Sequence, residues 1–130
     1  MSARPVGRRH SCTSADARAR LHDAEAFLDT ADLAADADVK ATNAVHAAIA
    51  ASDAICCYEL NERSADGNHS AAVNLLAAVD SRLANALNRA LVHKTQASYE
   101  SRDISSSDAE KCIHQARTLT EAARALIRLS

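Results

Sequence analysis

The sequence contains few of the residues that form turns and sheets. Its 130 residues include two glycines, one proline, two tyrosines and one phenylalanine, and tryptophan is absent. β-Branched and aromatic side chains favour strands, whereas alanine and leucine favour helices. The composition therefore argues against a β-rich fold. It predicts a core of Leu, Ile, Val and Ala, in which small alanines allow helices to pack closely.

The sequence also lacks an excess of charge of one sign. Lys and Arg number 15, Asp and Glu number 17, and the formal net charge is −2 with a pI near 6.3. No general positive field attracts nucleic acid, which counts against a typical DNA-binding module but allows a small local basic site. With 48% hydrophobic residues, a chain of this length can bury the core of one domain.

Long apolar runs are absent, and cysteines are few. No segment reads as a signal peptide or a membrane span. Cys12, Cys56, Cys57 and Cys112 do not form a disulfide pattern, and we expect four free thiols, packed as small hydrophobic groups in a cytoplasmic protein. Cys12 with His10 could be half of a metal site, but no second half has ligand spacing, so we expect no metal and no cofactor.

Helical periodicity dominates the rest of the chain. Thr13 with Asp16 and Ser107 with Glu110 resemble capping boxes at helix starts. Short connectors between such helices predict an all-α fold, an antiparallel four-helix bundle over residues 14–130. Apolar residues recur at three- and four-residue spacing in four segments, residues 14–31, 39–62, 68–98 and 107–128.

Residues 1–13 are polar, hold the only proline and show no periodicity, so we predict a flexible N-terminal arm. Arg4, Arg8, Arg9 and His10 in this arm could contact phosphate. We interpret them as part of a solvated tail.

A polar break at residues 61–69 separates the second and third predicted helices. Gly67 could adopt a positive φ as a C-cap, and Asn68 could cap the following helix. Arg63 then stands at the exit of one helix and His69 at the entry of the next. One turn could therefore present both side chains to the same small volume.

Arg63 and His69 are suited to phosphate chemistry. An arginine offers a planar fork of donors, a histidine side chain can move a proton near neutral pH, and a helix N-terminus favours an anion. Together they could cleave RNA without a metal. A base activates the ribose 2′-OH, the oxygen attacks the neighbouring phosphate, and cationic donors stabilise the charge. The structural alternative, which the residues alone favour, is that Arg63 satisfies carbonyls at a helix end and His69 is exposed.

Several polar residues lie beside the apolar strip of the second predicted helix, including Asn43, His46 and Asp53. They could be exposed at the bundle edge, Asp53 and His46 could hydrogen-bond across a helix pair, or they could form the wall of a site. Asp53 is the best candidate for a site wall, because it lies about two and a half turns before Arg63.

An all-helical domain of this size with an R-x4–6-H motif leading into its third helix resembles the HEPN family. The motif here is Arg63-Ser-Ala-Asp-Gly-Asn-His69. The likeness to a small actinobacterial-type branch of the family extends to flanking stretches within residues 15–128, namely residues 43–56, 94–99 and 108–111.

The resemblance implies a metal-independent endoribonuclease, often a toxin of a toxin–antitoxin or phage-defence system, that acts as a dimer with two motifs in one cleft. Arg63 would bind and stabilise phosphate, and His69 would act as general base or acid, with His69 of a second copy in the other role. The implied partners are an RNA substrate, a second copy and a nucleotidyltransferase-type antitoxin. Supporting site candidates are Asp53, Ser64, Asn68 and His46.

The sequence departs from the family pattern at two positions. Active members often have Asn, Asp or His directly after the arginine, where this chain has Ser64. A subset carries a tyrosine that the antitoxin modifies, where this chain has Ala71. The alternatives are a catalytically inactive HEPN-like bundle that binds a protein partner or a nucleotide, and a purely structural helical protein.

Overall fold

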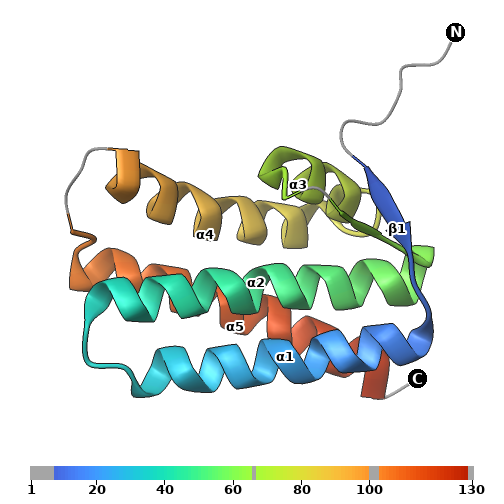
Figure 1. Cartoon of the computed structure of the whole chain (residues 1–130), viewed down its shortest axis with the longest axis horizontal. Helices are drawn as coiled ribbons and strands as arrows, with labels where there is room; N and C mark the ends of the chain where they lie inside the picture. The colour runs from blue at the N-terminus through green and yellow to red at the C-terminus, as the bar shows by residue number, and fades with distance from the viewer. Residues whose placement is uncertain (1–7, 66, 100–102, 129–130) are drawn as a thin grey trace, which may run out of the picture.

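The computed structural model describes residues 8–65, 67–99 and 103–128 and is mostly helical, at 81% (Figure 1). This confirms the all-α prediction at the level of fold class. No helix in the described ranges is long and apolar enough to cross a membrane. The elements in chain order are β1 (Arg9–Ser11), α1 (Ser14–Leu33), α2 (Ala37–Leu60), β2 (Glu62–Ser64), α3 (His69–Ala77), α4 (Ser81–Tyr99) and α5 (Ser106–Arg128).

Helix α2 lies at the centre of the fold. Helices α1, α5 and α4 pack against it, and the short α3 lies on α4 (Figure 1). Between Ala44 and Cys57 nearly every side chain of α2 is buried, and half of the buried ones are alanines. Small side chains allow neighbouring backbones to approach closely, so one helix can be covered on several sides. The largest fully buried side chains include Leu21, Ile55, Leu76, Leu87 and Leu119.

The predicted start of the first helix is confirmed. The Asp16 N–H donates to the Thr13 hydroxyl at 3.2 Å, and the Thr13 N–H donates to the Asp16 carboxylate at 2.8 Å. This reciprocal pair is the predicted capping box. Asp36 caps α2 by accepting from the Val39 N–H at 3.0 Å.

The prediction of one long helix over residues 68–98 is wrong, because α3 and α4 are separate. The Asp80 N–H donates to the Leu76 carbonyl at 3.0 Å, which closes the end of α3. The Asp80 carboxylate accepts from the N–H groups of Arg82 at 2.8 Å and Leu83 at 3.3 Å. Aspartate is a strong N-cap residue. The apolar periodicity continues across the break and therefore does not reveal it.

Helix α5 begins at Ser106, so the capping box predicted at Ser107 is wrong. The Ser105 hydroxyl accepts from the Asp108 N–H at 3.0 Å and caps the helix instead. In the connector before it, Ile104 is buried and its N–H donates to Asp38 at 3.3 Å. The start of α5 is thereby attached to the start of α2.

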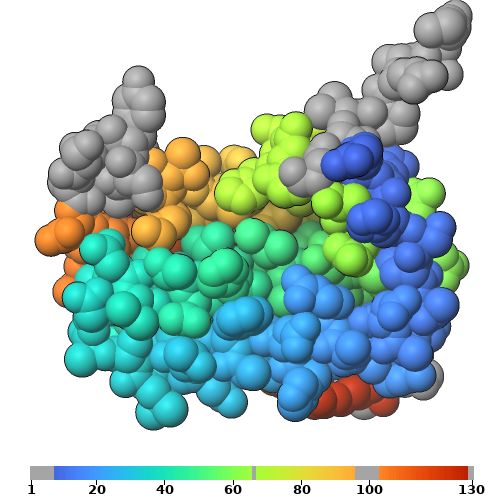
Figure 2. All heavy atoms as spheres, viewed as in Figure 1, coloured from blue at the N-terminus to red at the C-terminus, as the bar shows by residue number. Residues whose placement is uncertain are grey.

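The N-terminal arm is not loose from residue 9 onward, which corrects the prediction for residues 9–13; residues 1–7 lie outside the described part. Strand β1 pairs antiparallel with β2, with His10 opposite Arg63. The Cys12 N–H donates to the Asn61 carbonyl at 2.9 Å and extends the contact beyond the strand. Figure 2 shows the β1 residues (blue) packed beside the segment that follows α2 (green) at one end of the molecule.

Cys12 and Cys57 form a disulfide with their Cα atoms 5.3 Å apart, so the prediction of four free thiols is wrong. The bond forms because β1 runs past the C-terminal end of α2, which brings together two cysteines that lie 45 residues apart in the sequence. Cys56 and Cys112 are free and buried. Burial raises the pKa of the Cys56 thiol to about 12 and that of the Cys112 thiol to about 11. Because disulfides persist in oxidising compartments, the cysteines do not favour a reducing one.

Breaking the disulfide should destabilise the fold. By the chain-entropy relation, a loop of this length contributes about 4 kcal/mol. We expect dithiothreitol to lower the free energy of urea unfolding of the wild type by about 2–4 kcal/mol. The Cys12→Ala/Cys57→Ala variant should not respond to dithiothreitol. Equal stability of the wild type with and without the reductant would contradict the prediction.

Glu25 connects α1 to α5. Its carboxylate accepts from Arg124 Nε at 2.9 Å and from Arg128 Nη2 at 2.7 Å. Burial alone would raise the pKa of Glu25, but hydrogen bonds from the two arginines and their charges outweigh it and lower the pKa. The ion pairs therefore favour the charged carboxylate in the folded state.

Glu25→Gln should reduce the free energy of unfolding by about 1 kcal/mol at neutral pH. The folded-state pKa lies below the unfolded one, so this contribution is complete above about pH 4.3 and is lost as the pH falls through the folded-state value. Urea unfolding at neutral and acidic pH measures both effects. The exposed Glu121→Gln on α5 is the control, and a difference from wild type that persists unchanged at acidic pH would argue against the ion pairs.

Candidate functional site

Arg63 lies in the middle of β2, directly after the end of α2. The helix ends at Asn61, which has a φ of 57° and donates its N–H to the Cys57 carbonyl at 3.1 Å. Asn61 is therefore the left-handed C-cap, and the prediction that Gly67 ends this helix is wrong. Gly67 does have a positive φ, of 71°, but within the turn before α3. Asparagine tolerates this conformation better than most residues.

The turn leads into α3 through the predicted cap. The Asn68 side chain accepts from the Ala71 N–H at 3.1 Å, which confirms Asn68 as the N-cap. His69 is consequently the first residue of α3, and it is exposed. Its position at a helix N-terminus is favourable for an anion nearby.

The structure brings most of the predicted site residues together. A depression of about 210 Å³ is lined by Arg63, Ser64, Asn68 and His69 from the β2–α3 segment and by Asp53 from α2. This hollow is called the Arg63 depression below. The sequence expectation that one turn presents Arg63 and His69 to the same volume agrees with this geometry.

Two polar groups of the Arg63 depression lack a hydrogen-bond partner among the described residues. The Arg63 side chain is half-buried, and its guanidinium forms no hydrogen bond or ion pair there. The adjacent Ser64 Oγ is buried and also lacks a hydrogen-bond partner. Buried polar groups are normally paired, so the half-buried Arg63 guanidinium is available to a ligand that offers oxygen acceptors.

Asp53 is buried, and it pairs with Arg20 of α1. Arg20 Nη2 donates to Asp53 at 3.0 Å, and Arg20 Nη1 donates to Asp23 at 3.0 Å. Burial raises the pKa of Asp53, and the charges of Arg20 and Arg63 only partly offset it. Sequence reasoning missed Arg20, because a contact across 33 residues leaves no local pattern.

His46 is not part of the Arg63 depression. It is exposed on α2, and its ring lies 5.2 Å from the ring of Phe27. The predicted alternative of a hydrogen bond across a helix pair is confirmed for Asp53, which accepts from Arg20 of α1. The exposure of His46 agrees with the predicted alternative that the polar residues beside the apolar strip lie at the edge of the bundle.

Asp53→Asn tests the balance between burial and ion pairing. The folded-state pKa of Asp53 is raised, so the folded protein is more stable with a neutral carboxyl than with a carboxylate at this position. This contribution to the free energy of unfolding is lost as the pH rises through the folded-state pKa. An amide resembles the neutral acid and still accepts from Arg20. We therefore expect urea unfolding at neutral pH to show the variant as stable as wild type or more stable.

Asp53→Leu is the matched comparison, because it leaves the Arg20 donors without their buried acceptor and should cost about 2 kcal/mol or more. A large loss of stability in Asp53→Asn, equal to that in Asp53→Leu, would show that the charge itself is required.

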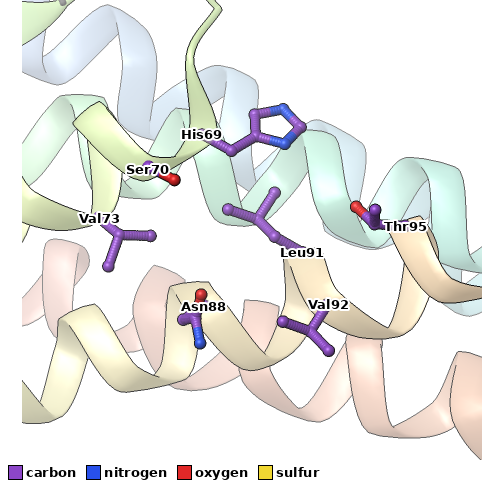
Figure 3. A pocket seen from close by; sticks show the side chains of 7 residues that line it. All are labelled: His69, Ser70, Val73, Asn88, Leu91, Val92 and Thr95. Atoms are coloured by element: carbon purple, nitrogen blue, oxygen red, sulfur yellow. The ribbon is translucent and has the colours of Figure 1, made fainter. Parts of the chain in front are cut away.

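A larger groove opens beside His69, between α3 and α4 (Figure 3). It measures about 420 Å³ and has a mainly apolar wall with a few polar groups. His69 borders both this groove and the Arg63 depression. The residues lining the groove are His69, Ser70 and Val73 from α3 and Asn88, Leu91, Val92 and Thr95 from α4.

A metal site is not evident in the described ranges, where no three His, Cys, Asp or Glu residues are placed to hold an ion together. The half-site suggested by Cys12 and His10 is not available in this state, because Cys12 is bonded to Cys57.

Comparisons with protein-family models, with curated proteins and with solved structures gave no match to this chain. The HEPN resemblance therefore has no support from relatives. The functional argument depends on the geometry around Arg63.

Proposed function

We propose that this protein is a metal-independent endoribonuclease of the HEPN type, with Arg63 and His69 at its centre. One observation carries the proposal. The half-buried Arg63 guanidinium, which has no hydrogen-bond partner among the described residues, lines the same depression as His69. An RNA phosphate supplies the oxygen acceptors that Arg63 lacks, and a histidine beside it can move the proton that cleavage requires.

The reaction divides among these side chains. Arg63 donates hydrogen bonds to the non-bridging phosphate oxygens, where negative charge grows in the transition state. His69 accepts the proton of the ribose 2′-OH, whose oxygen attacks phosphorus. Asp53 takes no direct part, because Arg20 already pairs with it. It interacts with Arg63 only electrostatically.

The groove between α3 and α4 suits the base next to the scissile phosphate. Its wall is apolar, as the face of a base requires, and Asn88, Ser70 and Thr95 offer hydrogen bonds to base edges. Because His69 borders both hollows, a nucleotide could place its phosphate at Arg63 and its base in the groove.

The HEPN type also implies a dimer, a role as toxin or phage-defence nuclease, and a nucleotidyltransferase-type antitoxin as partner; these belong to the proposal. The apolar arc of α2 does not itself call for a second copy, because α1, α4 and α5 already cover it. The exposed large apolar side chains among the described residues are Leu33, Val39 and Val92, of which Val92 lines the groove.

Arg63→Ala and His69→Ala should each reduce RNA cleavage by at least about 100-fold without unfolding the protein. Total bacterial RNA incubated with purified protein in EDTA, analysed by primer extension, measures the rate and maps the sites. Arg82→Ala and His114→Ala, at exposed positions outside the depression, are the matched controls. Arg63→Lys should rescue only partly, because an ammonium lacks the planar fork.

Two results would contradict the proposal. One is cleavage that is unchanged in both site variants, which would place the activity elsewhere or in a contaminant. The other is absence of cleavage by wild type on any RNA. If uridine 3′-monophosphate then bound the wild type but not Arg63→Ala, the alternative of an inactive nucleotide-binding bundle would take its place.

A further inference from the structure

A second hollow meets the Arg63 depression at Arg63. It measures about 410 Å³, and its lining includes His10 and Ser11 of β1, Asp16 and Arg20 of α1, and Arg63 itself. Arg63 therefore lines both hollows. His69 lies in one of these hollows and His10 in the other.

The pairing of β1 with β2 sets the position of His10. In the antiparallel register His10 is directly opposite Arg63. Residues opposite each other in such a pair have Cβ atoms about 5 Å apart and point to the same face. The side chains of His10 and Arg63 therefore lie next to each other, and both border the same hollow.

The strand that carries His10 is anchored at its end. Cys12, two residues later, is bonded to Cys57 of α2. Its N–H donates to the Asn61 carbonyl at 2.9 Å, and its carbonyl accepts from the Asn61 side chain at 3.3 Å. A histidine of an N-terminal segment is thus held beside Arg63 by one covalent bond and two hydrogen bonds.

Cleavage by His69 as base leaves one requirement open, because the departing 5′-oxygen needs a proton. Arginine does not release a proton at ordinary pH, so Arg63 and Arg20 cannot supply it. Asp53 is buried and paired with Arg20. Among the described residues that line the two hollows, the only histidines are His10 and His69.

We propose that His10 is the second catalytic residue of the Arg63 site and protonates the leaving 5′-oxygen; this rests on the proposed function. The 2′-oxygen forms its bond to phosphorus as the bond from phosphorus to the 5′-oxygen breaks. The 2′-OH proton passes to His69, and the proton of the His10 imidazolium passes to the 5′-oxygen. The products are a 2′,3′-cyclic phosphate and a 5′-hydroxyl, with no change in oxidation state.

The charged residues around His10 are of both signs. The charged residues that line the hollow with His10 are Arg63, Arg20 and Asp16. On the two strands themselves, Arg9 of β1 and Glu62 of β2 form an ion pair at 3.2 Å.

A change of leaving group tests the role of His10. The substrate is an RNA oligonucleotide spanning a mapped cleavage site, made with either oxygen or sulfur at the 5′-bridging position of that phosphate. A thiolate leaves without a proton, whereas an alkoxide does not. We expect His10→Ala to cleave the oxygen substrate about 100-fold more slowly than wild type and the sulfur substrate at nearly the wild-type rate.

Matched variants separate a catalytic role from a structural one. His69→Ala should slow cleavage of both substrates, because the base is needed for either leaving group. His22→Ala, at an exposed position on α1, should cleave both as wild type does. His10→Gln, which keeps a polar strand residue, should behave as His10→Ala does. Dithiothreitol should resemble the His10 substitution by releasing the end of β1.

The outcomes distinguish this proposal from the function on which it rests. If wild type cleaves and His10→Ala cleaves the oxygen substrate equally fast, His10 is not the acid, and His69 of a second copy takes that role. Equal slowing of both substrates in His10→Ala and His10→Gln would reduce His10 to a structural residue. If wild type cleaves neither substrate, the nuclease function itself fails.

Discussion

The pairing of Arg20 with Asp53 is the interaction on which the candidate site depends. A carboxylate buried in α2 needs a cation, and the donors at 3.0 Å come from α1. Because that requirement is met within the α1–α2 contact, Arg63 forms no hydrogen bond or close ion pair with the described residues on the strand that follows α2. Without Arg20, the nearest available cation would be Arg63, and its guanidinium would be drawn to Asp53 instead of a ligand.

The site is assembled from segments that are far apart in the chain. Arg20 comes from α1, Asp53 from α2, Arg63 and Ser64 from β2, and His69 from α3. Helix α2 acts as the support, because it is covered on several sides and both its ends are capped. The disulfide between Cys12 and Cys57 adds the N-terminal strand to this support. A short two-stranded sheet, marginal by itself, is thereby held at the open end of the helices.

Sequence reasoning succeeded where the signal was local. Periodicity located the helices, and the Thr13 and Asn68 caps were recognised because a cap acts over three residues. It failed at Asp80, where an N-cap interrupts an apolar stripe that continues in phase. It also assigned the C-cap to Gly67 and missed Asn61, since either residue can adopt a positive φ and only the actual end of α2 decides between them.

The sequence by itself determined the helical class, the polar turn between α2 and α3, and the presence of an arginine and a histidine at its two sides. Each of these follows from residue types and spacings within a few turns of chain. The tertiary structure alone decided that Arg20 pairs with Asp53, that Cys12 meets Cys57, and that His10 lies opposite Arg63. Those contacts join residues 33 to 53 positions apart, where packing rather than local propensity selects the partner.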